Sequence, residues 1–288
     1  MMPNIILAKK AGFCFGVKRA VDEALNCQKE KSKKIYTLGP LIHNKDVVSE
    51  LEGKDIHSIT MEDINMLQKD DVIVIRSHGV SKATIDLLKE RHLDIVDASC
   101  PYVKHIHNIV QKYYEDGYQI VIIGDENHPE VIGINGWCNN SAIILNQGEV
   151  KTKLARKVCV VCQTTERQEN FKRAINSIAE ECKEFVVFNT ICSATEERQK
   201  SAAELAGQVD IMIVVGDKTS SNTNKLYEIC KNKCHKTFHI ENHLELNKFF
   251  HKDIDISNMN IGITAGASTP DNVINEVISK LKGDVCNG

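Results

Sequence analysis

Three cysteines in similar local sequences are the residues of this chain best suited to metal chemistry. Cys14 lies in AGFCFGVKRAV, Cys100 in DASCPYVKHIH and Cys192 in NTICSATEERQ. Each precedes a segment with helix-like apolar spacing, and a helix N-terminus favours the thiolate through its free N–H groups and its dipole. Because the thiolate is the form that ligates metal ions, the repeated pattern predicts three metal ligands.

Three convergent thiolates would suit a [4Fe–4S] cluster with one open iron. Such clusters usually take four cysteine ligands, so a set of three leaves one iron available to an oxygen atom of a substrate. A structural zinc site would instead be closed by four ligands. A single cysteine often only fills core space, and the threefold repetition is what favours the metal site.

The remaining cysteines do not share this pattern. Eleven cysteines in a chain expected in a reducing compartment favour metal binding or catalysis over structural disulfides. Cys159 and Cys162 fall within a strand-like run, where their side chains face opposite sides, so both are expected in the core. Zinc-like spacing occurs in CKNKCHKTFH, which contains Cys230, Cys234, His235 and His239. This run lacks the intervening loop of a zinc finger, and we expect no zinc site there.

Polar loops recur at similar distances after each of the three cysteines. The first loop comes 29, 28 and 29 residues later, at His43, His128 and Ser221. The second comes 64, 64 and 76 residues later, at His78, Thr164 and Ser268. Each loop ends an apolar, strand-like run, and open α/β sheets bind ligands outside the carboxyl ends of their strands. The shared spacing therefore predicts that cysteines and loops face one cavity, although each loop alone could be an ordinary turn or cap.

The loop residues are mostly neutral donors, which suit a phosphate or diphosphate group. In TSSN, Ser220 and Asn222 are two apart on a segment expected to be extended, so both could face one ligand. HPE is expected to do the same for His128 and Glu130. A partly buried glutamate can deliver a proton, which makes Glu130 the candidate acid. Lys and Arg residues are expected on solvated helix faces.

The elements that must position these residues form three similar α/β units. The cysteines are 86 and 92 residues apart, and each follows a strand-like run, NIILA, LDIVDA or FVVFNT. Pro101 suits a first helical turn, so a helix is expected directly after Cys100. We predict units over residues 1–97, 98–189 and 190–282 and a tail over 283–288. The fold class is α/β, a trefoil with pseudo-threefold symmetry around a central cavity.

Composition excludes several other classes of protein. The net charge of −3 argues against a nucleic-acid-binding surface, which needs a basic excess. No apolar run approaches the ~18 residues that span a bilayer. The N-terminal MMPNIILAKKAGF has too short an apolar core for a signal peptide. We therefore predict a cytoplasmic protein with neither nucleic-acid nor membrane partners.

Taken together, the motifs resemble a known enzyme family. GFCFGV, SHGV, DASCP, HPE, QTT, TICSAT, SSN and TAGAS occur in order from about residue 9 to about residue 280. In this set and order they resemble the LytB/IspH family of 4-hydroxy-3-methylbut-2-enyl diphosphate reductases. The resemblance implies three α/β domains around a [4Fe–4S] cluster and the last step of the methylerythritol phosphate route to isoprenoids. An external electron donor of the ferredoxin or flavodoxin type is also implied.

The resemblance further implies a role for each motif residue. The cluster ligands would be Cys14, Cys100 and Cys192. Glu130 would supply the proton, and Thr164 would bind the substrate hydroxyl and help pass that proton on. The residues implied to hold or line the diphosphate site are His43, His78, His128, Ser220, Ser221, Asn222 and Ser268. Two alternatives remain at this point: an iron–sulfur hydro-lyase without net electron transfer, and an iron–sulfur sensor or electron carrier without a substrate.

Overall fold

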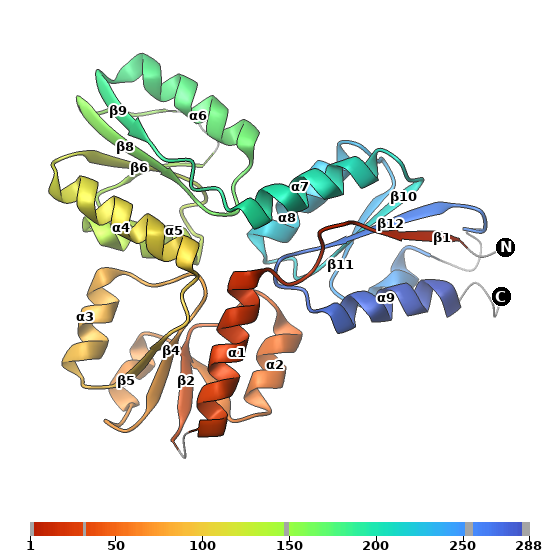
Figure 1. The fold of residues 1–288 in the computed structure, drawn as a ribbon, viewed down its shortest axis with the longest axis horizontal. Helices are drawn as coiled ribbons and strands as arrows, with labels where there is room; N and C mark the ends of the chain where they lie inside the picture. The colour runs from red at the N-terminus through yellow and green to blue at the C-terminus, as the bar shows by residue number, and fades with distance from the viewer. Residues whose placement is uncertain (1–2, 31–32, 147–149, 251–255, 284–288) are drawn as a thin grey trace. The chain divides into compact units, whose positions relative to one another are not determined.

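The computed structural model describes residues 3–30, 33–146, 150–250 and 256–283 (Figure 1). The chain divides into two compact units. The terminal unit comprises Met1–Cys14, His43–Lys45 and Ser193–Gly288, and the central unit comprises Phe15–Ile42 and Asp46–Cys192. The predicted tail 283–288 lies outside the described residues from residue 284 onwards.

The described residues form three parallel sheets of four strands each. Two sheets belong to the central unit and one to the terminal unit. Five of the six inner strands read VIVI, QIVII, KVCVVC, IMIVV and NIGITA, and nearly all of their residues are buried. Such continuous apolar runs are typical of parallel sheets, because helices cover both faces. The predicted α/β class with three similar units is confirmed.

The first sheet of the central unit has the strand order β3-β2-β4-β5. Its strands are β2 (Ile35–Leu38), β3 (Ile56–Ile59), β4 (Val72–Ile75) and β5 (Asp94–Asp97). The helices of this part of the chain are α1 (Phe15–Glu30), α2 (Lys45–Glu52), the 3-10 helix η1 (Glu62–Met66) and α3 (Lys82–Glu90).

The second sheet of the central unit has the strand order β7-β6-β8-β9. Its strands are β6 (Gln119–Ile123), β7 (Ile143–Leu145), β8 (Lys157–Cys162) and β9 (Glu184–Val187). The helices are α4 (Pro101–Glu115), α5 (Pro129–Asn135), the 3-10 helix η2 (Gly136–Cys138) and α6 (Gln168–Glu181). Buried residues of α4 and α5 pack on one face of this sheet and those of α6 on the other (Figure 1).

The sheet of the terminal unit has the strand order β1-β12-β10-β11. Its strands are β1 (Asn4–Leu7), β10 (Ile211–Val215), β11 (Thr237–Ile240) and β12 (Asn260–Ala265). The helices are α7 (Ser193–Ala206), α8 (Ser221–Lys231), the 3-10 helix η3 (His243–Lys248) and α9 (Asp271–Gly283). One core cluster joins α9 and η3 to one face, and a second joins α7 and α8 to the other.

Strand β1 takes a place that the division of the chain into consecutive ranges did not anticipate. It lies at the start of the predicted range 1–97, yet it pairs with β12 of the predicted range 190–282. In this position β1 matches β5 and β9, which are the edge strands of the other two sheets. Each of the three candidate cysteines therefore follows an edge strand and precedes a helix. The three predicted ranges themselves stay a prediction.

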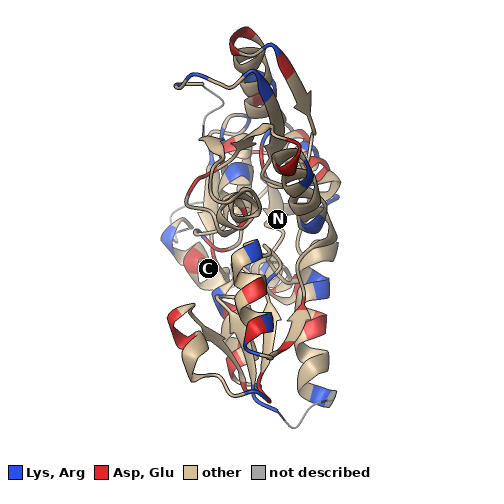
Figure 2. Cartoon of the chain, turned by 90° about the vertical axis from the view of Figure 1, so that its left-hand side faces the viewer, with Lys and Arg blue, Asp and Glu red and all other residues tan. Residues whose placement is uncertain are grey.

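Local sequence signals explain where the helices after the cysteines begin. Helix α4 starts at Pro101, as predicted, and Cys100 is its N-cap residue. Helices α1 and α7 likewise begin at Phe15 and Ser193, directly after Cys14 and Cys192. No described helix is both long and apolar enough to cross a bilayer. Basic and acidic residues are interspersed along the helices (Figure 2), which agrees with the small net charge.

Candidate active site

The three candidate cysteines are anchored to the backbone in the same way. In the central unit the Cys100 N–H donates to the carbonyl of Ser77, after β4, at 2.9 Å, and the Cys192 N–H to that of Thr164, after β8, at 3.0 Å. In the terminal unit the Cys14 N–H donates to the carbonyl of Ala267, after β12, at 3.1 Å. Each cysteine is thus tied to the second polar loop of the sheet whose edge strand precedes it.

The candidate cysteines differ from core cysteines in their exposure, and one of them packs closely against helix α1. All three are partly exposed. A Cβ atom at Gly16, in the first turn of α1, would lie 2.6 Å from the Sγ atom of Cys100. Because real Cβ atoms do not approach other atoms so closely, only glycine fits there. Partly exposed thiols are accessible to an inorganic cluster, and the lack of a side chain at Gly16 allows α1 to approach Cys100 closely.

Glu130 and Thr164 form a buried pair in the central unit. Only 2% of Glu130 is exposed. Its Oε1 atom accepts the Thr164 N–H at 2.6 Å, and its Oε2 atom lies 2.7 Å from the Thr164 hydroxyl, which donates to it. The carbonyl of the same threonine accepts the N–H of Cys192. Thr164 therefore binds both the carboxylate of Glu130 and the backbone of Cys192.

His128 and His78 lie close together beside this pair. His128 is the N-cap of α5, and its Nδ1 atom accepts the N–H of Glu130 at 3.1 Å. The proton of a neutral ring is then on Nε2, so that His128 presents an N–H donor there. The rings of His78 and His128 meet edge to face, with centroids 5.3 Å apart. Both rings can offer donors to an anionic group.

The polar loops of the terminal unit also form a defined arrangement. Ser220 is the N-cap of α8, and its Oγ atom accepts the N–H of Thr223 at 3.4 Å. Asn222 lies in the first turn, and both polar atoms of its side chain are buried with no hydrogen-bond partner among the described residues. The hydroxyl of Ser268 donates to the carbonyl of His43 at 2.7 Å. A helix N-terminus with a buried, unpartnered amide suits an anion.

The structure corrects the expected backbone of two motifs. Ser221 and Asn222 are not on an extended segment, because they begin helix α8. Glu130 likewise lies in the first turn of α5, directly after Pro129, and only His128 is extended, with φ −74° and ψ 133°. In both motifs, side-chain capping of free helix N–H groups favours the helix start over continued strand. The proline at the first helical position also favours it in α5.

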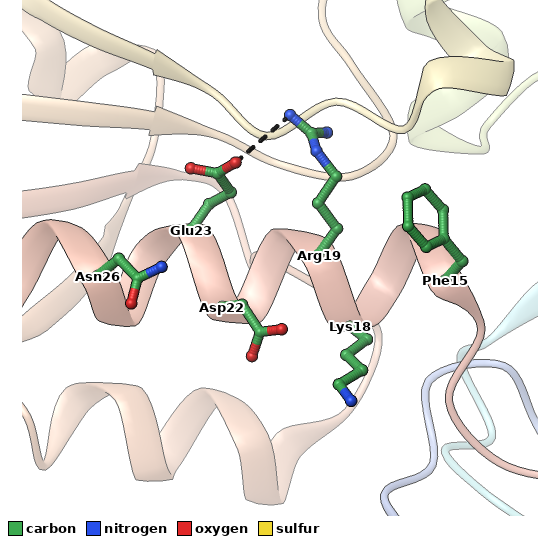
Figure 3. Close-up of a pocket in the computed structure, with 6 residues that line it drawn as sticks. All are labelled: Phe15, Lys18, Arg19, Asp22, Glu23 and Asn26. Atoms are coloured by element: carbon green, nitrogen blue, oxygen red, sulfur yellow. Dashed lines mark ion pairs between the residues drawn. The ribbon is translucent and has the colours of Figure 1, made fainter.

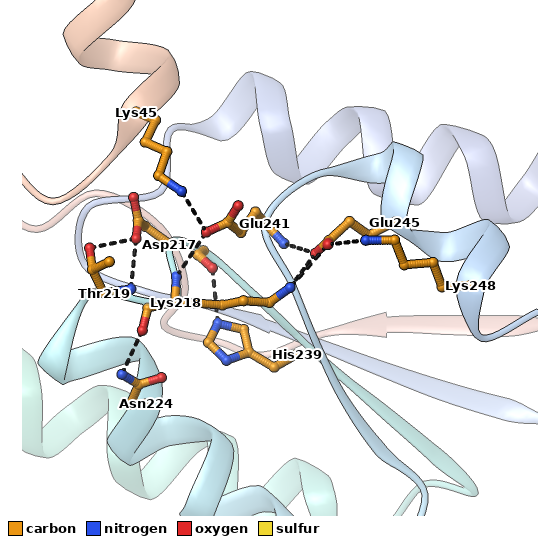
Figure 4. Close-up of polar contacts among 10 residues, drawn as sticks. Lys45, Asp217, Lys218, Thr219, Asn224, His239, Glu241, Glu245 and Lys248 are labelled. Atoms are coloured by element: carbon orange, nitrogen blue, oxygen red, sulfur yellow. Dashed lines mark hydrogen bonds and ion pairs between the residues drawn. The ribbon is translucent and has the colours of Figure 1, made fainter.

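An ion-pair network supports the loop between β10 and α8 (Figure 4). The Asp217 carboxylate accepts the N–H and the hydroxyl of Thr219, at 2.7 and 2.6 Å. Although burial alone would raise the pKa of Asp217, hydrogen bonds from Thr219 and the charges of Lys45 and His43 hold it below the ordinary value. Lys45 lies 3.5 Å from the carboxylate of Glu241, which also accepts the Lys218 N–H.

Glu245 anchors the far end of the same network. Its carboxylate accepts the Lys218 ammonium at 2.8 and 3.0 Å, the Lys248 ammonium at 2.6 Å and the Glu241 N–H at 2.9 Å. Burial alone would raise the pKa of Glu245, but these hydrogen bonds lower it to about 2. The lysines beside the loop are thus paired with carboxylates, which leaves neutral donors at the start of α8.

Six of the remaining cysteines are buried in the described part of the chain, and Cys182 is partly exposed. Cys159 and Cys162 belong to core clusters on opposite faces of β8, as predicted. Burial raises the pKa of the Cys159 thiol to about 12 and does the same for Cys230. Among the described residues, Cys230, Cys234, His235 and His239 do not form a metal-ligating group. His239 instead contacts the carbonyl of Gly216 at 2.9 Å.

Two residues of the terminal unit, Arg198 and Asp217, have structural roles that were not predicted from the sequence. Arg198 is not on a solvated face, because its guanidinium is buried and bonded to backbone carbonyls. Asp217 was also missed, although a carboxylate directly after a buried strand is a signal that could have identified it.

No residue in the predicted site lines the pocket on α1, which is formed by Phe15, Lys18, Arg19, Asp22, Glu23 and Asn26 (Figure 3).

Comparison with protein families gives one match over nearly the whole chain. The model of the family described as LytB protein matches residues 5–282. Among curated relatives, a 4-hydroxy-3-methylbut-2-enyl diphosphate reductase of Clostridium perfringens (strain SM101 / Type A) is 59% identical over 282 residues, covering 98% of this chain and 99% of the relative. A protein of the same name from Clostridium tetani is 56% identical over 99% of this chain, which spans 44% of that longer relative.

Solved structures are similar over the same range. One is titled as (E)-4-hydroxy-3-methyl-but-2-enyl diphosphate reductase, the terminal enzyme of the non-mevalonate pathway. It is 42% identical, with a TM-score of 0.71 over 97% of this chain and 99% of that chain. Another is the E-1-hydroxy-2-methyl-but-2-enyl-4-diphosphate reductase from Plasmodium falciparum. It is 26% identical, with a TM-score of 0.86 over 97% of this chain and 88% of that chain.

Proposed function

The chain belongs to the LytB protein family, and from this premise we propose that it is a reductase of (E)-4-hydroxy-3-methylbut-2-enyl diphosphate. The reaction consumes two electrons and two protons, breaks the allylic C–O bond and releases the hydroxyl oxygen as water. The products are isopentenyl diphosphate and dimethylallyl diphosphate, which differ in the carbon atom that receives the second proton. This is the last step of the methylerythritol phosphate pathway.

The proposed cofactor is one [4Fe–4S] cluster ligated by Cys14, Cys100 and Cys192, with one iron left open. When bound, the cluster supplies electrons from an external ferredoxin- or flavodoxin-type donor and a Lewis-acidic iron. The equivalent N–H anchors of the three cysteines and their partial exposure support this assignment. The elevated thiol pKa values of Cys159 and Cys230 argue against either as a ligand, because the thiolate is needed.

In the proposed site, hydrogen-bond donors hold the diphosphate. They are His43, His78, His128, Ser220, Ser221, Asn222 and Ser268. The buried, unpartnered amide of Asn222 and the N-terminus of α8 support this role in the terminal unit. The Nε2–H of His128 supports it in the central unit. The side chains of histidine, serine and asparagine can all donate hydrogen bonds to the oxygen atoms of such an anion.

Glu130 is the proposed proton donor, and Thr164 is the residue proposed to bind the substrate hydroxyl and relay the proton. The observation that carries this assignment is the pair of hydrogen bonds, 2.6 and 2.7 Å long, between the Glu130 carboxylate and Thr164. Thr164 also binds the Cys192 N–H through its carbonyl, so the acid is linked to a cysteine segment by a single residue. A hydroxyl that donates to a carboxylate can pass a proton in the opposite direction once that carboxylate is protonated.

The test is turnover by anaerobically reconstituted protein, with and without a low-potential reductant. We expect both isopentenyl and dimethylallyl diphosphate to form only when the reductant is present. Turnover of the substrate without reductant would identify a hydro-lyase instead. A protein that binds the cluster and exchanges electrons, but consumes no diphosphate substrate under either condition, would identify an electron carrier or sensor.

A further inference from the structure

Arg198 is a buried arginine on α7, the helix that begins directly after Cys192. Only 6% of the residue is exposed. Its Nε and Nη2 atoms donate to the carbonyl of Gly12 at 3.2 and 2.9 Å, and its Nη1 atom donates to that of Ala194 at 2.7 Å. All three residues belong to the terminal unit. A permanently charged guanidinium is therefore bonded to the backbone two residues before Cys14.

The Cys14 segment is held from two sides. On one side the Cys14 N–H donates to the carbonyl of Ala267, and on the other Arg198 binds the Gly12 carbonyl. Gly12 itself has a φ of +80°, and a Cβ atom there would contact Ile274 and Asp271 at 3.0 and 3.1 Å. The turn before Cys14 thus has little freedom, and the guanidinium fixes its carbonyl in place.

A second arginine makes a comparable contact in the central unit. Arg19 lies on α1, the helix that follows Cys14, and donates to the carbonyls of Ser99 and Asp97 at 2.9 and 3.3 Å. These carbonyls come one and three residues before Cys100. In both cases the helix that follows one candidate ligand supplies an arginine to the segment that precedes another. The same contact therefore occurs twice in the fold, and of the two arginines only Arg198 is buried, which is rare for a charged side chain.

We infer that Arg198 is a positioning residue for the iron–sulfur cluster, an inference that rests on the proposed function: it holds the Cys14 segment and stabilises the reduced cluster by its charge. Reduction adds a negative charge to the cluster, and a nearby positive charge favours that state. Gly12 and Cys14 are two residues apart, so their Cα atoms are within ~7.6 Å. Burial keeps this interaction from being screened by solvent and salt.

Arg198 rather than Arg19 is the decisive residue to test. The Arg19 side chain is 28% exposed and lies 3.7 Å from the carboxylate of Glu23. Water and that carboxylate weaken the field of Arg19 at any cluster. Arg198→Lys keeps the charge but loses the planar fork that binds Gly12 and Ala194 together. Arg198→Gln removes the charge, so the two variants separate the mechanical and the electrostatic contributions.

The experiment uses the full chain, reconstituted anaerobically and studied without substrate. The midpoint potential is measured by redox titration followed by electron paramagnetic resonance, and the rate of iron release to a chelator is measured separately. We expect Arg198→Gln to lower the reduced-to-oxidised ratio at fixed potential about tenfold, equivalent to about 59 mV for one electron. We expect Arg198→Lys to keep the potential of the unaltered protein and to release iron several-fold faster.

The matched control is Lys200→Gln, which removes a charge from an exposed position of the same helix. A potential of Arg198→Gln equal to that of this control would overturn the electrostatic role. If Arg198→Gln does not retain the cluster, Arg198→Lys decides, and an unchanged iron-release rate there would overturn the inference.

The proposed function and this inference fail in distinguishable ways. An unaltered protein that binds no iron–sulfur cluster refutes both. A protein that binds the cluster but does not reduce the diphosphate refutes only the proposed function, because potential and iron release are measured without substrate. A protein that reduces the diphosphate, with Arg198 variants indistinguishable from the control, refutes only the inference.

Discussion

Glu130 is the residue whose replacement tests the proposed chemistry most directly. Glutamine keeps the size and one acceptor oxygen of the side chain, so the hydrogen bond from the Thr164 N–H can persist. It cannot deliver a proton. We expect Glu130→Gln to retain iron and sulfide at the level of the unaltered protein and to lose turnover about 10²-fold or more, the usual contribution of a general acid. The measurement is kcat with saturating substrate and reductant.

The matched control for this prediction is Glu126→Gln, four residues earlier and exposed. It removes the same charge outside the buried pair, and its kcat should equal that of the unaltered protein. If Glu130→Gln turned over as fast as Glu126→Gln, Glu130 would not be the proton donor.

Single residues differ in how far their positions could be predicted from the sequence. Glu130 and Thr164 could be identified because their loops recur at a constant distance from repeated cysteines. Arg198 could not be identified, because arginine is mostly exposed in proteins and nothing in TEERQ indicates a buried arginine that binds backbone carbonyls. Only its contact with Gly12, 186 residues away in the chain, gives it a role. Contacts of that range depend on tertiary packing that local patterns do not encode.

Helix α1 packs against the sulfur of Cys100 through Gly16, and this packing makes a second prediction. Alanine at residue 16 favours the helix by up to ~1 kcal/mol over glycine, so α1 itself is not weakened. Its Cβ atom would instead meet Sγ of Cys100 at 2.6 Å and displace it. We expect Gly16→Ala to bind less than half of the iron bound by the unaltered protein after anaerobic reconstitution, approaching the loss expected for Cys100→Ser.

Gly133→Ala is the matched control for Gly16→Ala. Gly133 is also helical, in α5, but a Cβ atom there would meet its nearest neighbours at 3.6 Å, an ordinary contact. Iron content should therefore stay normal in this variant. Equal iron content in the two alanine variants would show that the space beside Cys100 does not matter for cluster binding.

The loop between β10 and α8 depends on Glu245 of η3 for its support. Replacing the carboxylate with an amide removes the charge that Lys218 and Lys248 share. The side chains of both lysines are about half exposed or more, so solvent screens their attraction to the carboxylate. We therefore expect Glu245→Gln to lower the free energy of unfolding at pH 7 by only about 1 kcal/mol. The measurement is the urea-unfolding midpoint, and Glu204→Gln, at an exposed position, is the control.

The pH dependence of this difference follows from the pKa of Glu245, which is lowered from 4.5 to about 2. A lowered pKa means that the carboxylate contributes stability above pH 4.5 and that this contribution is lost as pH falls toward 2. The gap between the unaltered protein and Glu245→Gln should therefore narrow below pH 4.5. A gap that stayed constant down to pH 3 would contradict the assignment of this stability to the ionised carboxylate.

Strands differ in how visible they are in the sequence. The inner strands β2, β4, β6, β8, β10 and β12 could be predicted because burial on both faces favours mostly apolar runs. The strands β3, β7 and β11 were not predicted. They lie at the edges of their sheets, are three or four residues long and read IHSI, IIL and TFHI, so that two of the three contain polar residues. Edge strands obtain their geometry from pairing with β2, β6 and β10, which local sequence does not reveal.

The three sheets of the chain are not formed by three consecutive ranges of residues, because the first strand pairs with the last. Each sheet ends in an edge strand that leads to a cysteine, and β1 supplies this strand for the sheet formed by β10, β11 and β12. Cys14 is accordingly bonded to Ala267 of that sheet, in the same way as Cys100 is bonded to Ser77. The repeat of cysteine and loops was visible in the sequence. It was not visible that the strand before Cys14 belongs to the last sheet, because the pairing of β1 with β12 joins residues 256 apart in the chain.

His107 of helix α4 packs against Gly79, in the loop after β4, and we expect it to contribute to the response of the central unit to acid. His107 is 4% exposed, stacks on Trp137 with ring centroids 5.0 Å apart, and lies where a Cβ atom of Gly79 would be 2.6 Å away. Burial lowers the pKa of His107 from 6.5 to about 4, with Asp97 raising it and Lys104 lowering it further. Since the folded pKa is depressed, the neutral ring contributes stability that is complete above pH 6.5 and declines as pH falls toward 4.

We therefore expect the free energy of unfolding of the unaltered protein to fall by roughly 1–2 kcal/mol between pH 7 and pH 5 because His107 becomes protonated on unfolding. His107→Phe, which keeps the stack on Trp137, should not show this fall. Trp137 is the single tryptophan of the chain, so its fluorescence during urea unfolding reports on this unit. His105→Phe is the control, because His105 is exposed on the same helix α4. That variant should lose as much stability between pH 7 and pH 5 as the unaltered protein. If His107→Phe also lost as much, the acid sensitivity of the central unit would arise from groups other than the buried histidine.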